Sequence, residues 1–133
     1  MSDDAFLDAF ESATLPNEAF RHRDHVRAAW IILGKEPLLP ALSRFRAALR
    51  RFAAAKGNPG LYHETITLAF LLLVFERRST GPRDEGWAGF AARNSDLLAW
   101  KPSVLARYYD EAALASDAAR ASFLVPAQIA RQT

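Results

Sequence analysis

The chain has 133 residues, of which 50% are hydrophobic, 24% charged and 11% aromatic, and its formal net charge is +2. This balance is typical of one soluble globular domain and excludes a disordered or fibrous chain. The sequence contains no cysteine, which excludes disulfides, zinc ribbons, iron–sulfur sites and thiol nucleophiles.

The N-terminal segment is acidic and amphipathic. Residues 1–20 carry five Asp or Glu and no Lys or Arg, the reverse of a signal peptide's basic start. Together with the lack of cysteine, this predicts a cytoplasmic protein. Apolar residues recur at three- and four-residue spacing from Ala5 to Ala13, behind the capping residue Ser2. The pattern predicts a helix over residues 3–13.

Two more amphipathic stripes follow before residue 60. The stripe from Val26 to Leu33 predicts a helix over residues 22–34, ended by a glycine. Apolar residues over 42–52 repeat in alternating steps of three and four, which predicts a helix over residues 38–56. The connections between these helices are short, which favours antiparallel neighbours.

The segment from Ile66 to Phe75 is almost wholly apolar. A helix that is hydrophobic on every side occupies the centre of a domain, so residues 62–78 are predicted to form a central buried helix. The apolar run is well short of the roughly 20 residues that cross a bilayer, so no membrane span is expected.

The remainder of the chain predicts shorter helices, over residues 87–92, 96–100, 104–114 and 117–124. No segment shows sustained period-two alternation, and no fixed-period repeat is present. We therefore predict an all-α fold: a single helical domain, residues 1–133, built as a compact bundle of five to eight helices around residues 62–78.

Basic residues concentrate in residues 21–58, which hold nine Lys or Arg and two acidic residues. Arg44, Arg46, Arg50 and Arg51 could form a face that contacts phosphates. Arginine is also this chain's usual cation, and no nucleic-acid reading motif accompanies these residues, so nucleic-acid binding is not expected. If the protein is instead a non-enzymatic helical interaction protein, a homodimer is the expected form.

The three histidines, His22, His25 and His63, each fall at or near the start of a predicted helix. An up-down-up arrangement would place two of these helix starts at the same end of the bundle, so all three imidazoles are predicted to converge. His22 and His25 share one face of their helix, and Glu64 and Thr67 follow His63 along the chain.

Three interpretations of these histidines stay open. In the first, His22, His25 and His63 bind a divalent metal, zinc, iron or manganese, and together with Glu64 perform metal-assisted chemistry on a small molecule. The spacing is compatible with a metal site, but the sequence has no His-Glu-x-x-His motif.

In the second interpretation, no metal is bound. Arg21, Arg23 and Arg27, with the positive helix N-termini, form a site for an anionic small molecule, and a histidine acts as general acid or base. In the third, the histidines cap helices and fill polar core positions. The candidate ligand-binding residues are Arg21, Arg27, Trp30, Tyr62 and Thr67.

Three strings carry a resemblance to other proteins: residues 20–25 (Phe-Arg-His-Arg-Asp-His), residues 62–67 (Tyr-His-Glu-Thr-Ile-Thr), and residues 105–109 followed by Ala119, Arg120 and Phe123. In these strings the chain resembles a family of small uncharacterised bacterial proteins. The resemblance spans most of the sequence and implies a complete single-domain protein. It implies no activity.

Overall fold

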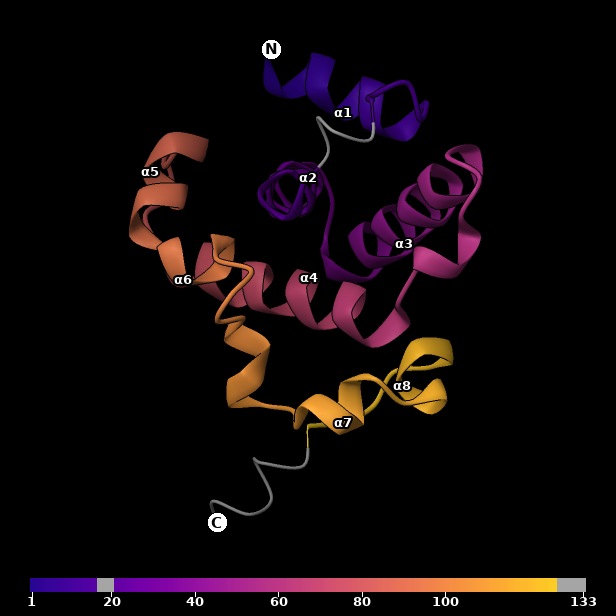
Figure 1. The fold of residues 1–133 in the computed structure, drawn as a ribbon. Coiled ribbons are helices and arrows are strands. Elements are labelled where there is room, and N and C mark those ends of the chain that lie inside the picture. Colours follow the sequence, from indigo (N-terminus) through magenta and orange to yellow (C-terminus); the bar gives the residue numbers. More distant parts are fainter. Residues whose placement is uncertain (17–20, 127–133) are drawn as a thin grey trace.

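The computed structural model describes residues 1–16 and 21–126. Within these ranges the chain forms eight α-helices and two short 3-10 helices, and no strand (Figure 1). The predicted all-α class is therefore confirmed.

The first four predicted helices each correspond to a helix of the structure. These are α1 (Asp3–Glu11), α2 (His22–Lys35), α3 (Leu38–Ala55) and α4 (Glu64–Ser79). Their ends lie close to the predicted ends because local residues set them. Ser2, for example, accepts a hydrogen bond from the Ala5 amide at 3.1 Å and caps α1.

The C-terminal third forms shorter helices: α5 (Trp87–Arg93), α6 (Ser95–Leu98), η3 (Val104–Arg107), α7 (Glu111–Leu114) and α8 (Asp117–Ala121). A further 3-10 turn, η2 (Pro59–Leu61), precedes α4. The single helix predicted over 104–114 is wrong. The chain turns after Tyr108, and Tyr109 is buried there with its hydroxyl donating to the Leu124 carbonyl at 2.6 Å. This hydrogen bond between distant residues holds a turn where the sequence predicted a continuous helix.

Helix α4 crosses the middle of the molecule, with α2 and α3 on one side and α7 and α8 on the other (Figure 1). Leu71 and Val74 on α4 are fully buried in the hydrophobic core. Leu72 and Phe75 are partly exposed, so the expectation of burial on every side holds for only part of its circumference. No described helix is both long and apolar enough to cross a bilayer.

The predicted up-down-up arrangement is wrong. In Figure 1, α2 is seen along its axis whereas α4 lies across the view, so the two helices cross instead of running side by side. The His22 ring packs against Phe70 of α4, with the ring centroids 4.6 Å apart. Phe70 lies seven residues beyond His63, about 10 Å along a helix axis. The start of α2 therefore meets the middle of α4, not its start.

The arginines of α3 are engaged within the fold. Arg44 pairs with Glu11 at 2.7 Å and with Glu36. Arg51 donates a hydrogen bond to the Glu11 carbonyl. Near the start of α4, Arg46 pairs with Glu64, and the Arg50 guanidinium lies over the Tyr62 ring. The basic stretch thus contacts α1 and the start of α4. This supports the structural explanation of the arginine-rich sequence over a phosphate-binding face.

Candidate functional site

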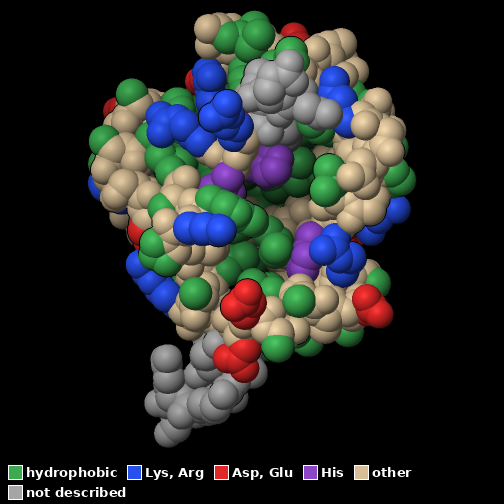
Figure 2. Space-filling view, viewed as in Figure 1, with side chains coloured by type: hydrophobic (Ala, Val, Ile, Leu, Met, Phe, Trp, Pro, Cys, Tyr) green, Lys and Arg blue, Asp and Glu red, His purple; other side chains and the backbone are tan. Residues whose placement is uncertain are grey.

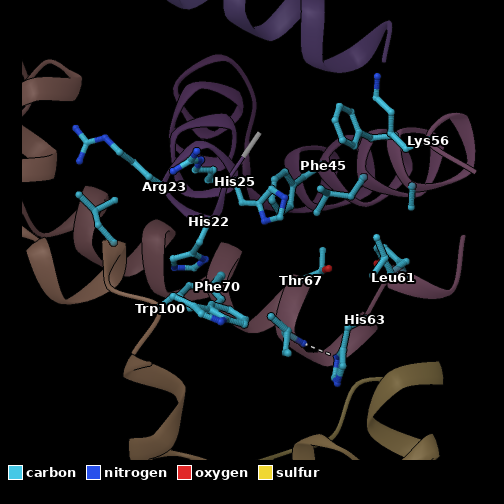
Figure 3. Close-up of a pocket in the computed structure, with 17 residues that line it drawn as sticks. His22, Arg23, His25, Phe45, Lys56, Leu61, His63, Thr67, Phe70 and Trp100 are labelled. Carbon is cyan, nitrogen blue, oxygen red and sulfur yellow. Dashed lines mark hydrogen bonds between the residues drawn. The ribbon is translucent and has the colours of Figure 1, made fainter. Parts of the chain in front are cut away.

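A pocket of about 860 Å³ lies between the start of α2, helix α3 and the first half of α4 (Figure 3). Its lining residues come from five parts of the chain: Arg21, His22, Arg23, His25, Phe45, Leu49, Phe52, Ala53, Lys56, Leu61, Tyr62, His63, Ile66, Thr67, Phe70, Leu98 and Trp100. The volume is in the usual range for small-molecule sites.

Most of the pocket wall is apolar. Phe45, which is 1% exposed, and Phe52 project from α3, while Ile66 and Phe70 project from α4. Trp100, which is 53% exposed, borders the pocket beside His22. Figure 2 shows the histidine side chains in a hollow of this face, with hydrophobic side chains between them and Lys or Arg side chains around it.

The first turn of α2 brings two histidines to the pocket. The Asp24 carboxylate accepts a hydrogen bond from the Arg21 amide at 2.9 Å, which fixes the start of the helix. His22 and His25 then lie three residues apart on the same face. The sequence predicted this shared face, and both side chains line the pocket.

His22 joins α2 to the end of α6 and to the residues that follow it. Its Nε2–H donates to the Leu97 carbonyl at 2.8 Å, and its ring contacts Phe70 and Trp100 with centroids 4.6 and 5.1 Å away. Burial lowers the pKa of His22 below its usual value, and the hydrogen bond to Leu97 opposes that shift only in part. His22 is therefore a neutral residue that positions the pocket wall.

His25 points between α3 and α4, toward the side of the pocket that holds Phe45 and Thr67 (Figure 3). Burial, and secondarily the neighbouring His22, lowers the pKa of the His25 imidazole to about 4. At neutral pH this side chain is therefore uncharged.

His63 is the N-cap of α4 and is 8% exposed. Its Nδ1 accepts a hydrogen bond from the Ile66 amide at 3.1 Å, and its Nε2–H donates to the Leu114 carbonyl at 2.7 Å. Both ring nitrogens are therefore occupied. Although His63 borders the pocket, these contacts support the capping interpretation and leave no lone pair for a metal.

Glu64 is held away from the pocket by a polar network. Arg46 Nε donates to both carboxylate oxygens, at 2.8 and 3.0 Å, and the Tyr62 hydroxyl donates to Oε1 at 2.5 Å. Although burial would raise it, these hydrogen bonds hold the pKa of Glu64 below its usual value. Tyr62 and Thr67 line the pocket as predicted candidates, whereas Glu64 does not.

The remaining predicted ligand residues lie at different places. Arg21 lines the pocket. Arg27 instead pairs with Asp3 at 2.9 Å and clamps α1 onto α2, and Trp30 borders a second, smaller cavity. Within residues 1–16 and 21–126, no group of three or more His, Asp or Glu side chains is placed to hold a metal ion.

The sequence did not single out the apolar wall as a site. Helical spacing marked Phe45, Leu49 and Phe52 as core residues, and they are, but they also line the pocket. Lys56 went unnoticed because nothing in its spacing separates it from a solvated cation, whereas Arg23, which the second interpretation named, does line the pocket.

Comparisons of the chain with family models, curated proteins and solved structures give no match. The resemblance to small bacterial proteins therefore stays a prediction.

Proposed function

We propose that this protein binds a small amphipathic acid: an organic molecule with an apolar body and a carboxylate or phosphate group. The observation that carries the proposal is the 860 Å³ pocket, which has aromatic walls and cationic side chains but no Asp or Glu among its described lining residues. The proposal keeps the anionic ligand of the second sequence interpretation, with Arg21 in the lining and Arg27 outside it.

The apolar wall supplies the affinity for the body of the ligand. Each methylene group moved from water into such a wall contributes roughly 0.8 kcal/mol, so a chain of eight to ten carbons gains enough to offset the entropy lost on binding. Phe45, Phe52 and Phe70 are already fixed by the core, so they need little reordering when a ligand enters.

The cationic side chains that line the pocket favour an anionic head group on the ligand. Arg23 and Lys56 have no ion pair with a described carboxylate: the Arg23 guanidinium lies over Trp87 at 5.5 Å, and the Lys56 ammonium over Phe52 at 5.3 Å. Arg21 adds a third cation to the lining. An anionic head group therefore finds positive charge, and a cationic one meets repulsion.

The test is a matched ligand series measured by isothermal titration calorimetry: decanoate, decanol and decylamine, which differ only in head group. We expect decanoate to bind saturably and at least tenfold more tightly than decylamine. Equal binding of all three, or of none, would overturn the proposal.

Two variants of adjacent residues locate the binding. Ala53 lines the pocket and Ala54 is exposed on the outer face of the same helix. Ala53→Trp fills the pocket and is expected to abolish decanoate binding, whereas Ala54→Trp leaves it unchanged. Loss in both variants, or in neither, would show that decanoate binds elsewhere.

A second candidate function is proton transfer by His25 to or from the bound acid. It is favoured by one observation, the neutral imidazole of His25 in the pocket lining. An anion bound beside this ring raises its pKa from about 4, so binding takes up protons at an acidic pH just above that value. Calorimetry in buffers of different ionisation enthalpy measures that uptake, and His25→Gln should remove it.

Metal-assisted chemistry stays a hypothesis without a supporting contact in the described part of the chain, since no metal-binding group is found there. Elemental analysis of protein purified without an affinity tag tests it directly.

A further inference from the structure

A second cavity, of about 280 Å³, lies at the other end of α2 and α4, apart from the residues of the larger pocket. It is lined by Trp30, Leu33, Phe75, Arg78, Ser79, Gly81, Pro82, Arg83 and Glu85. This cavity contains the one tryptophan that the sequence marked as a candidate ligand contact.

Arg78 is the unusual side chain of this cavity. Its Nη1 is buried and has no hydrogen-bond partner among the described residues, and its guanidinium lies over the Trp30 ring at 4.4 Å. Gly34 permits this position, because a Cβ there would lie 2.6 Å from Nη2. A buried guanidinium nitrogen without an acceptor is unfavourable, so an acceptor that reaches it from outside the fold would be bound favourably.

The two carboxylates that influence Arg78 electrostatically are both engaged elsewhere. Glu85 accepts two hydrogen bonds from Arg93, at 2.9 and 2.8 Å, and Asp3 accepts one from Arg27 at 2.9 Å. Burial lowers the pKa of Arg78, yet a guanidinium remains protonated at neutral pH. The cavity therefore holds a positive charge that no described carboxylate pairs with.

We propose that this cavity binds a small oxyanion, the carboxylate or phosphate group of a metabolite, with Arg78 as the principal donor. Its planar fork can donate two hydrogen bonds to such a group. The hydroxyl of Ser79 and the cation of Arg83 border the same space, and Trp30 and Phe75 supply an apolar wall. The site is independent of the larger pocket.

The experiment is an NMR titration that follows the indole N–H of Trp30, assigned with a Trp30→Phe variant. Inorganic phosphate and succinate are titrated separately at constant ionic strength. Saturable shifts with one probe and not the other identify the phosphate or the carboxylate chemistry, and saturation with both identifies a general oxyanion site. Failure of both probes to saturate overturns the proposal.

Three variants assign the binding to Arg78. Arg78→Gln is expected to weaken binding at least tenfold, while Arg107→Gln, which removes an exposed cation elsewhere, leaves it unchanged. Gly34→Ala keeps every charge but displaces the guanidinium, and is expected to weaken binding at least fivefold even if Arg78→Gln fails to fold. Unchanged binding in Gly34→Ala, or equal weakening in Arg107→Gln, overturns the assignment. Ala53→Trp should not affect this site.

Discussion

His22 donates its Nε2–H to the carbonyl oxygen of Leu97, 75 residues further along the chain, at 2.8 Å. This hydrogen bond ties the first turn of α2 to the end of α6. Leu98 and Trp100, which lie within three residues of Leu97, form one side of the larger pocket. The position of that side therefore depends on a histidine that the sequence had marked as a catalytic residue and a metal ligand.

Replacing His22 should loosen this wall. His22→Ala removes the hydrogen bond and the ring contacts with Phe70 and Trp100, so we expect a loss of about 1–3 kcal/mol in the free energy of unfolding. His22→Gln carries an N–H at the equivalent position and should retain part of the stability that His22→Ala loses. Urea denaturation measures both. Full stability in His22→Ala would contradict the positioning role.

His63 is expected to act through the cap of α4. His63→Ala leaves the Ile66 amide and the Leu114 carbonyl without their partner, which should reduce the free energy of unfolding by about 2–3 kcal/mol. His63→Asn should recover about 1 kcal/mol, because an Asn side-chain oxygen can accept from Ile66. If the Asn variant were no more stable than the Ala variant, the cap would not be the reason.

Stability should fall as the pH drops from 6.5 to about 4 because of His25. The folded protein holds the His25 pKa at about 4, whereas an unfolded histidine titrates near 6.5. In this interval the unfolded chain binds the proton and the folded chain does not, so acid favours unfolding by up to about 3 kcal/mol. Urea titrations at several pH values measure the slope, and His25→Gln should flatten it. An unchanged pH dependence of stability in His25→Gln would show that another group takes up the proton.

A second acid-sensitive contact operates at lower pH. Arg77 donates to both carboxylate oxygens of Asp96, at 2.9 and 2.8 Å, and lowers the Asp96 pKa to about 2. Its contribution is present above the unfolded pKa and is lost as pH falls from about 4 to 2. We expect Asp96→Asn to cost about 1 kcal/mol at pH 7, after allowance for solvent screening of this partly exposed pair.

The control for this contact is Asp84→Asn, which removes an exposed carboxylate and should change stability by less than about 0.5 kcal/mol. The difference between Asp96→Asn and the unmodified protein should shrink below pH 4. A difference that persists to pH 2 would mean that packing, not charge, carries the effect.

Local sequence patterns were enough to locate the helices and most of their ends. Apolar periodicity and local caps such as Ser2 act within one or two turns, so they can be found without knowing any distant contact. The apolar run after Ile66 also identified the helix that lies at the centre of the fold. The break after Tyr108 was missed because its cause, the Tyr109 hydroxyl on the Leu124 carbonyl, is tertiary.

The contacts of the candidate side chains, in contrast, follow from how the helices pack together. The crossing of α2 over α4 separates His22 from His63, and each ring finds its carbonyl partner more than fifty residues away, at Leu97 and Leu114. No local pattern encodes such a pairing, because hydrogen-bond partners of a buried ring are whichever carbonyls the packing brings within reach. The same packing assembles the apolar pocket from residues that periodicity identifies only as core.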